Sequence, residues 1–230
     1  AACVRDISKR RSGGRLDFRL TDDPAEVLDN PGIDLVIELI GGISPAKEFI
    51  LRAIKNDKHV ITANKALLAC YGGEISRAAK EKRRFVGYEG AVAGGIPIIK
   101  LIREGLVANK VTRLEGIING TCNYVLTGMQ KRQASFEEIL KEAQKLGFAE
   151  ADPSFDIDGI DAAQKLAIIA SLLFGIPINF ERIYTDGISN IELDDLNYAE
   201  KLGYQIKHLA IASRSPLGFE LRVHPTLVAH

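Results

Sequence analysis

The sequence predicts an α/β fold, with a doubly wound parallel sheet in the first part of the chain and an α+β domain in the second. Apolar runs of strand length alternate with segments of helical spacing over the first ninety residues. This βαβαβ order implies parallel strands joined by right-handed crossovers. After residue 92 the alternation stops, and several helices follow one another. We therefore expect two domains, residues 1–92 and residues 93–230.

The elements of the first domain are bounded by changes in hydrophobic period. Residues 33–40 form a near-continuous apolar run, as a strand buried on both faces should, and residues 44–55 have helical spacing. The elements that follow are a strand at 58–63, a helix near 72–82 and a strand at 84–90. The chain opens on "AACV", which looks like the end of a strand, and contains no GxGxxG. The first strand and the phosphate loop of a dinucleotide-binding domain are thus expected to be missing.

The second domain is expected to combine helices with a few strands. Its predicted helices lie near 96–106, 121–131, 135–146, 160–174 and 195–213, and its predicted strands at 111–120 and 219–228. A turn, Ser-Pro-Leu-Gly, precedes the last strand.

The composition excludes several classes of protein. The 230 residues include 30 basic and 30 acidic side chains, so no basic field favours nucleic acid. No apolar run of about 18 residues and no signal peptide occurs, so we expect a cytoplasmic protein that does not enter a membrane. The three cysteines form no CxxC pair and the four histidines lack the spacing of metal ligands. Neither disulfides nor zinc are expected.

Two of the predicted strands are followed by residues suited to ligand binding. Gly41 and Gly42 follow the first strand, and Asn64 and Lys65 follow the second. Ligands of open α/β sheets lie beyond the carboxyl ends of the strands, so a cofactor or substrate is expected beside these residues. The alternative for Lys65 is a solvated surface lysine.

A glycine-rich segment, "EGAVAGG", begins at Glu89. A strand, a turn and a helix here mimic a phosphate-binding loop, but the spacing fits neither standard fingerprint. Backbone carbonyls and the Glu89 carboxylate could converge on a hard cation, which prefers oxygen ligands. A tight turn that only packs against a neighbour is the alternative.

A strand-to-helix junction carries Asn119, Gly120 and Thr121. Free backbone N–H groups and a hydroxyl at such a junction could hold an anion such as a carboxylate, or Thr121 could simply cap the helix. Cys122 lies in the first turn, where a thiol could act as a nucleophile. The alternative is a buried, inert cysteine.

The segment before the helix at 160–174 is acidic, and the helix itself contains a lysine. Asp158 is a plausible N-cap, and Asp161 and Lys165 share one helix face at i, i+4. Because the helix is apolar on almost every side after Lys165, this lysine is expected in a cleft, as a proton donor and acceptor oriented by Asp161. Glu150 and Asp156, on the preceding loop, would attract an amine. A structural ion pair is the alternative.

Four separated motifs resemble homoserine dehydrogenase in order and spacing. They are "VITANKALLA", "EGAVAGGIPII", "GIINGTCNYVLTGM" and "GFAEADPSFDIDGIDAAQKLAIIASLLFG", which together span residues 60–175. The preceding segment, from "CVRDISKR" through "ELIGG", resembles the rest of that family's nucleotide domain. The resemblance implies interconversion of L-homoserine and L-aspartate 4-semialdehyde with NAD(P), in threonine and methionine biosynthesis.

The resemblance also implies roles for individual residues. Lys165 would take the proton of the substrate hydroxyl as hydride leaves its carbon, Asp161 would orient Lys165 and bind substrate, and Lys65 would lie beside nicotinamide and substrate. Glu150 would hold the substrate amino group, supported by Asp156. The implied cofactor contacts are Gly41 and Gly147. Gly42 is a further candidate because it follows the first predicted strand.

A cation and a cofactor preference follow from the same resemblance. Glu89 and the carbonyl groups of Val92, Gly94 and Ile96 match the family's site for a monovalent cation, expected to be sodium. Arg5, with Lys9 nearby, favours NADP over NAD, although the neighbouring Asp6 weakens that preference.

The resemblance further implies a homodimer or higher homo-oligomer through residues 194–213. The family's GxGxxG loop is missing before Ala1, and its late glycine- and threonine-containing segment is missing after His230. We therefore expect the intact protein to be the enzyme and the chain as given to bind nucleotide poorly.

Two alternatives to this function stay open on the sequence. One is a semialdehyde dehydrogenase of similar layout that uses Cys122 as a covalent nucleophile. The other is a non-catalytic dimerisation module in which Asp161 and Lys165 form a structural bridge only.

Overall fold

The computed structural model describes residues 1–9 and 18–229. The chain divides into two compact units, Ala1–Ile96 (unit 1) and Pro97–His230 (unit 2). Unit 1 thus ends at Ile96, whereas the expected boundary was at residue 92. Each unit has a hydrophobic core of its own.

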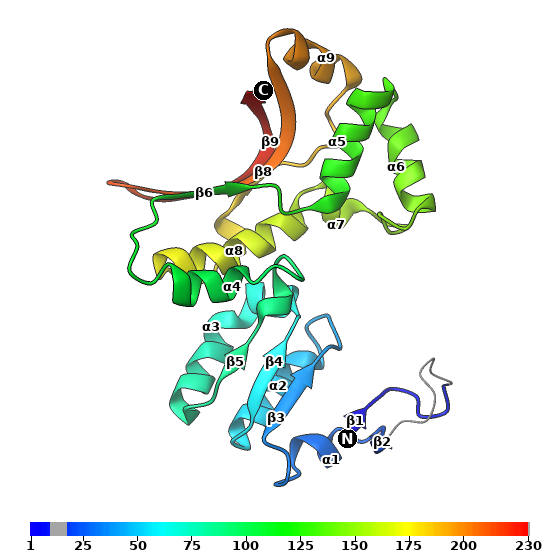
Figure 1. Ribbon diagram of the computed structural model, residues 1–230. Coiled ribbons are helices and arrows are strands. Elements are labelled where there is room, and N and C mark those ends of the chain that lie inside the picture. Colours follow the sequence, from blue (N-terminus) through cyan, green and yellow to red (C-terminus); the bar gives the residue numbers. More distant parts are fainter. Residues whose placement is uncertain (10–17, 230) are drawn as a thin grey trace. The chain divides into compact units, whose positions relative to one another are not determined.

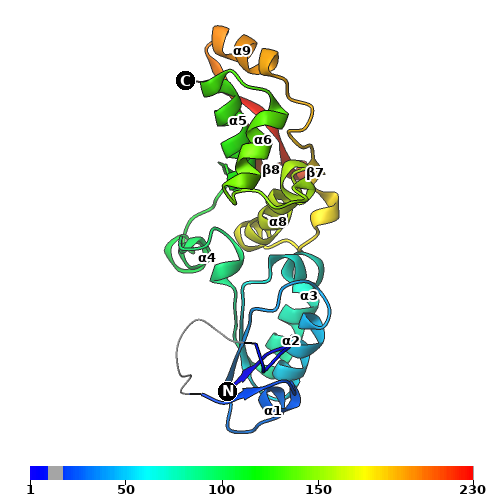
Figure 2. The ribbon, with the colours of Figure 1, turned by 90° about the vertical axis from the view of Figure 1, so that its right-hand side faces the viewer.

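Unit 1 contains a parallel three-stranded sheet in the order β3-β4-β5. Its strands are β3 (Leu35–Glu38), β4 (His59–Thr62) and β5 (Val86–Gly87), connected by helices α2 (Ala46–Lys55) and α3 (Lys65–Lys82). Since strands adjacent in sequence are adjacent in the sheet, both helices lie on the same face and pack against each other (Figure 2). Ile50, Val60 and Leu67 are among the residues of the core between them.

The other face of this sheet differs from the expectation of a strand buried on both sides. In β3, Val36 and Glu38 are buried, whereas Leu35 and Ile37 are exposed, Ile37 to 59%. Helices α2 and α3 cover one face only, so side chains alternate between core and surface. Unit 1 also contains a separate parallel pair of strands, β1 (Ala2–Cys3) and β2 (Leu20–Thr21), and the short helix α1 (Ala25–Leu28). The described residues of unit 1 thus form two small parallel sheets.

Unit 2 is built on a mixed four-stranded sheet in the order β6-β8-β9-β7, of which Figure 1 labels β6, β8 and β9. Strands β8 (Tyr204–Ser215) and β9 (Gly218–Ala229) form a long antiparallel hairpin, β6 (Arg113–Gly116) pairs antiparallel with β8, and β7 (Tyr184–Thr185) pairs parallel with β9. Helix α8 (Ile160–Phe174) packs on this sheet through small residues, which lets the helix approach closely.

A second core of unit 2 lies among three helices and the start of β8. The helices are α5 (Gly120–Arg132), α6 (Phe136–Lys145) and α9 (Leu193–Lys201). Their buried contacts include Cys122, Leu126, Ile139, Leu196 and Ile206. The remaining short elements are α4 (Ile98–Lys100) with a π-helical turn at Leu101–Gly105, α7 (Ser154–Ile157) and a 3-10 turn at Phe180–Arg182.

The predicted helix at 195–213 is wrong over its second half. Helix α9 ends at Lys201, Gly203 adopts a φ of +83°, and β8 begins at Tyr204. Residues 208–212 are all buried, because both faces of this part of the strand are covered. The strand therefore lacks the alternation of apolar and polar residues that would distinguish it from a buried helix.

No helix in the described ranges 1–9 and 18–229 has both the length and the apolar character to cross a membrane.

Packing of α8 on the sheet predicts a large effect of shortening Leu166, which is fully buried. Leu166→Ala should lower the free energy of unfolding by about 2–5 kcal/mol, because it removes buried apolar surface and leaves a cavity. Leu217, in the hairpin turn, is fully exposed and serves as a control. Leu217→Ala should change the free energy by less than about 0.5 kcal/mol. Chemical denaturation followed by circular dichroism measures both; equal effects would contradict the packing.

Candidate active site

The acidic segment and helix α8 meet at Gly159, which is the N-cap of α8 with a φ of +84°. The sequence predicted Asp158 in this place, but Asp158 ends α7 instead, and no side chain caps α8. A Cβ on residue 159 would lie 3.0 Å from Thr185 and 3.2 Å from His208. Glycine therefore suits this position for two reasons: it adopts a positive φ without strain, and it has no side chain to meet Thr185 and His208.

Lys165 and Asp161 form an ion pair in which Asp161 is buried and Lys165 is partly buried. Lys165 Nζ donates to Asp161 Oδ2 at 2.6 Å and to the Ile118 carbonyl oxygen at 2.9 Å. The side chains are only 19% and 5% exposed. The i, i+4 spacing thus yields a desolvated pair and not the solvated surface pair that such spacing usually gives.

Asn119 connects this pair to a second carboxyl group. Its Nδ2 donates to Asp161 Oδ2 at 2.9 Å and to Asp156 Oδ1 at 2.8 Å. Its Oδ1 accepts the backbone N–H of Cys122, so Asn119 is the N-cap of α5. The sequence had offered Thr121 as a possible cap of this helix. Asp156 lies on α7 and not on the expected loop. Figure 1 shows α5, α7 and the start of α8 converging at this point.

Thr121 contacts the same cluster. Its Oγ1 lies 2.9 Å from Asp156 Oδ2 and 3.0 Å from the Phe148 carbonyl oxygen, so its single proton is shared between two acceptors. An anion was expected beside Asn119 and Thr121, and the carboxylate that these side chains bind is the protein's own Asp156.

The cluster opens into a pocket of about 710 Å³. Asn119, Thr121, Asp156, Asp161 and Lys165 line one end, and the pocket continues along the outer side of α5. Two carboxyl groups and one lysine give this end a net negative charge. Such a pocket suits a small ligand with an amino group that can approach the carboxylates and a second polar group that can reach Lys165 Nζ.

Cys122 is buried in the core beneath this cluster. Burial, followed by the negative charge of Asp156 and Asp161, raises the pKa of its thiol to about 12. Its Sγ donates to the Asp156 carbonyl oxygen at 3.2 Å. The buried position expected in the inert alternative is thus observed, and the raised pKa argues against a nucleophilic role.

Glu150 and Gly147 are not among the residues that line this pocket, although Gly147 adjoins Phe148, which does line it. Glu150 is exposed, and its backbone carbonyl accepts a hydrogen bond from Gln144 Nε2 at 3.1 Å. Gly147, with a φ of +77°, follows α6 and donates its N–H to the Gln144 carbonyl oxygen.

The candidate cofactor residues of unit 1 occupy the carboxyl ends of its strands. Gly41 and Gly42 follow β3 with φ values of +76° and +70°, and Lys65 is the first residue of α3. Arg5 and Lys9 are exposed. Arg5 lines a pocket of about 980 Å³ whose other walls include Glu38 and residues of α2.

The glycine-rich segment after β5 forms a tight turn. Ala93 and Gly95 have positive φ, and the Ile96 N–H donates to the Ala93 carbonyl oxygen at 2.8 Å. Glu89 begins the 3-10 helix, Val92 is buried, and Gly94 is exposed. Within the described part of the chain, no group of three or more His, Cys, Asp or Glu side chains could hold a metal ion.

Two residues that the sequence did not single out support the junction of α7 and α8. A Cβ on Gly187 would lie 2.3 Å from the Ile157 carbonyl oxygen, which accepts the N–H of Ile188 at 2.8 Å. His208 Nε2 lies 2.9 Å from the Asp186 carbonyl oxygen, and burial lowers the pKa of its imidazole. Neither residue belongs to a motif, because each acts through backbone atoms far away in sequence.

Both units resemble known proteins. Residues 97–230 match the sequence family described as "Homoserine dehydrogenase", and residues 1–89 match "Homoserine dehydrogenase, NAD binding domain". A homoserine dehydrogenase of Pseudomonas aeruginosa is 55% identical over 228 residues, which are 98% of this chain and 52% of that protein. The chain spans about half the length of the curated relatives it matches.

Solved structures agree with these matches. A homoserine dehydrogenase from Thiobacillus denitrificans has a TM-score of 0.94 at 56% identity, covering 99% of this chain and 52% of that one. A hyperthermophilic archaeal homoserine dehydrogenase in complex with NADPH has a TM-score of 0.76 at 26% identity, covering 90% of this chain and 60% of that one.

The burial of Cys122 predicts that alkylation will distinguish the cysteines. In native protein treated with iodoacetamide, Cys122 should stay unmodified, because its pKa of about 12 leaves almost no thiolate at neutral pH. The exposed Cys70 should be labelled, and all cysteines should react after unfolding. Mass spectrometry of the digested protein measures this. Rapid labelling of native Cys122 would contradict the buried assignment.

The close approach at Gly187 predicts opposite effects of two glycine substitutions. Gly187→Ala should lower the free energy of unfolding by about 1–3 kcal/mol, because its methyl group would overlap the Ile157 carbonyl. Gly73→Ala is the matched control: it lies within α3, with nothing within 4 Å of a Cβ, and should raise the free energy by about 0.5–1 kcal/mol. Chemical denaturation measures both, and a neutral Gly187→Ala would refute the clash.

Proposed function

Because the chain belongs to the homoserine dehydrogenase family, we propose that this protein interconverts L-homoserine and L-aspartate 4-semialdehyde with NAD(P). The observation that carries this proposal is the buried pair of Lys165 and Asp161 at the wall of a pocket. The pair holds the Lys165 amine at the pocket wall, where it could accept the hydroxyl proton of a bound alcohol. The chain spans about half the length of its relatives, so the activity itself is part of the proposal.

Lys165 is the acid/base of the proposed reaction. Two of the three positions around its Nζ are used by Asp161 and the Ile118 carbonyl, which leaves one direction toward the pocket. In that direction a neutral Nζ accepts the hydroxyl proton of homoserine as the C–H bond breaks, and the resulting ammonium stays paired with Asp161. In the reverse reaction the same ammonium protonates the forming alkoxide.

The carboxyl groups bind the substrate amino group. Asp156 and Asp161 lie at the pocket wall, where their negative charge attracts an ammonium group, and Asn119 and Thr121 hold Asp156 in place. We assign Glu150 to the amino group as well, on the family resemblance alone, since its side chain is exposed and outside the pocket lining.

The nicotinamide cofactor supplies the hydride acceptor when it is bound. Gly41 and Gly42 fit a flat ring or a phosphate close to the backbone, because both have positive φ and nothing lies within 4 Å of a Cβ there. We assign Lys65 and Gly147 to the same cofactor, with unit 1 as one half of a doubly wound domain. Arg5 and Lys9 favour NADP, and the NADPH bound by the archaeal relative supports that choice.

A sodium ion and a homo-oligomer complete the proposal. We assign the ion to Glu89 and the carbonyl groups of Val92, Gly94 and Ile96, whose positive-φ neighbours Ala93 and Gly95 bend the backbone sharply.

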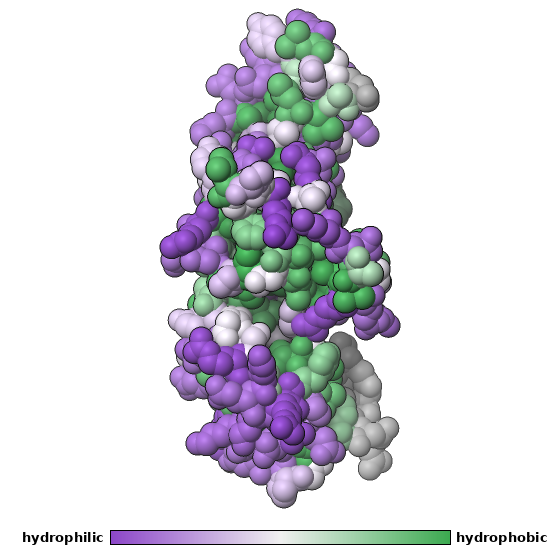
Figure 3. Space-filling view, turned by 90° about the vertical axis from the view of Figure 1, so that its left-hand side faces the viewer, coloured by the Kyte–Doolittle hydropathy of each residue, from purple (hydrophilic) through white to green (hydrophobic). Residues whose placement is uncertain are grey.

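The homodimer surface is proposed at the open end of the β8–β9 hairpin. Residues 204–209 and 224–229 pair only with each other in the described part of the chain. Leu202 and Leu227 are exposed beside them, and Figure 3 shows apolar residues at several places on the surface. Open strand edges with exposed apolar side chains favour association with another chain.

The burial of Cys122 and the raised pKa of its thiol argue against the thiol-dependent alternative. A non-catalytic module would retain the buried pair without turnover, so the assay below distinguishes it.

The role of Lys165 predicts a large loss of turnover on its removal. In the protein at its full natural length, Lys165→Ala should lower kcat for homoserine oxidation by about 10²–10⁴, the usual contribution of a general base. Lys145→Ala, on an exposed face of α6, should leave kcat unchanged. Absorbance of the reduced nicotinamide measures both. A loss below about tenfold for Lys165→Ala would contradict the assignment, and absence of turnover in the wild type would contradict the function.

A further inference from the structure

A buried acidic residue ends strand β3. Glu38 is only 3% exposed, and within the described residues its carboxyl oxygens accept hydrogen bonds from neutral groups. Its Oε1 accepts the backbone N–H groups of Ile40 at 2.7 Å and Gly41 at 3.2 Å, and its Oε2 accepts the hydroxyl of Thr62 at 2.6 Å. Three donors thus offset the cost of burying this carboxyl group.

Thr62 and Asn64 continue this network into the next loop. Thr62, at the end of β4, accepts the N–H of Asn64 at 3.0 Å. Asn64 Nδ2 donates to the Gly42 carbonyl oxygen at 2.6 Å, and its Oδ1 accepts the N–H of Leu67, which caps α3. The hydrogen bonds run from the loop after β3 to the loop after β4 and back again, so the two loops are tied at both ends.

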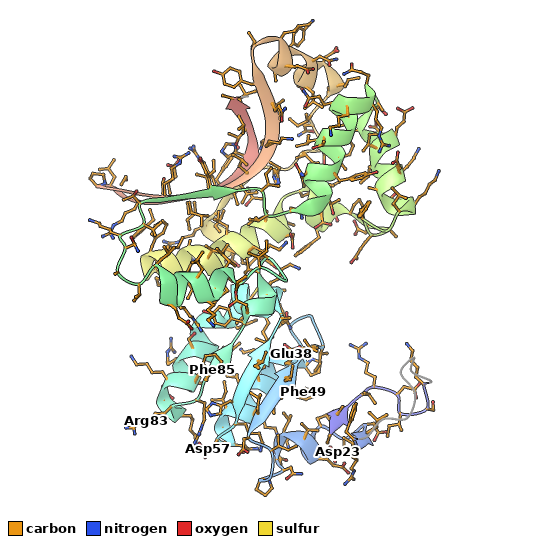
Figure 4. All side chains as sticks on the ribbon, viewed as in Figure 1. Asp23, Glu38, Phe49, Asp57, Arg83 and Phe85 are labelled. Carbon is orange, nitrogen blue, oxygen red and sulfur yellow. The ribbon has the colours of Figure 1, made fainter. Side chains whose placement is uncertain are left out.

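This closed circuit of hydrogen bonds borders three of the candidate cofactor contacts of unit 1, which are Gly41, Gly42 and Lys65. Gly41 donates directly to Glu38, and Gly42 accepts directly from Asn64. Lys65 follows Asn64 and begins the helix that Asn64 caps. Figure 4 labels Glu38 at the carboxyl end of β3, on the edge of the sheet where these loops begin.

We propose that Glu38 is a positioning residue for the nicotinamide cofactor, because its carboxyl group, through Thr62 and Asn64, fixes the Gly41–Gly42 turn relative to Lys65. The inference rests on the proposed function, in which both contact the cofactor. Glu38 itself does not touch the ligand; it holds backbone N–H groups and a helix start in the arrangement that a bound ring requires. Two loops held in advance bind a ligand with less loss of conformational entropy.

Three substitutions break the circuit at different points. Glu38→Gln removes the charge and replaces the oxygen that accepts the Thr62 hydroxyl with an NH2 group. Thr62→Val removes a hydroxyl at nearly constant shape, and Asn64→Ser keeps a helix cap but loses the bond to Gly42. Each should raise the dissociation constant of reduced nicotinamide cofactor about tenfold, measured by fluorescence titration of the full-length protein without substrate. The KM for homoserine should change less than threefold. Thr62→Ser, which keeps the hydroxyl, should restore cofactor binding to within about twofold of wild type.

A buried lysine in the same unit provides the control for a merely structural role. Lys58 is 2% exposed, precedes β4 at its other end, and donates to the carbonyl oxygens of Asn30 and Ile33 at 2.5 and 2.7 Å. Lys58→Met should lower the melting temperature and leave the cofactor dissociation constant unchanged.

The proposal is overturned if Glu38→Gln, Thr62→Val and Asn64→Ser behave like Lys58→Met, with lower melting temperatures and an unchanged dissociation constant. If one variant does not fold, the other two and the recovery in Thr62→Ser still decide the question. A wild type that binds cofactor but does not oxidise homoserine would contradict the proposed activity, while the titrations would still test the positioning role.

Discussion

The buried pair of Lys165 and Asp161 is the interaction on which the arrangement of unit 2 depends. A desolvated ion pair is costly unless its remaining hydrogen-bonding capacity is met, and here the Ile118 carbonyl and Asn119 meet it. Those partners come from the segment before α5, so α5 and α8 must start at a fixed separation.

Both units use an asparagine N-cap to connect a helix start to another segment of the chain. In each, an asparagine caps a helix with its side-chain oxygen and uses its side-chain nitrogen to bind a different segment: Asn64 caps α3 and binds Gly42, whereas Asn119 caps α5 and binds Asp156 and Asp161. A helix start is thereby coupled to a loop or to a carboxyl group. Lys65 and Thr121 lie in the first turns of these helices, so the caps help to fix their positions.

Local patterns explain which parts of this protein were predictable. The strands and helices of unit 1 alternate clearly, and Asp161 and Lys165 are one helical turn apart, so both could be predicted from sequence. The end of α9 could not be predicted, because residues 208–212 of β8 are all buried and show no alternation of apolar and polar side chains. The bonds from Asn119 to Asp156 and from Glu38 to Thr62 join residues far apart in sequence, and no local pattern marks them. A single acidic residue inside an apolar run, such as Glu38, interrupts the hydrophobic pattern of the strand but does not indicate which groups it binds.

The amide of Asn119 places a strict chemical demand on its position. Both hydrogens and the oxygen of the amide are engaged, so its orientation is unique and a flipped amide would set like groups against each other. Aspartate would bring a third negative charge to the two carboxylates, and glutamine would be one methylene too long. Among the standard amino acids, only asparagine offers this number of donors and acceptors at this reach, so the identity of residue 119 is set by hydrogen-bond stoichiometry alone.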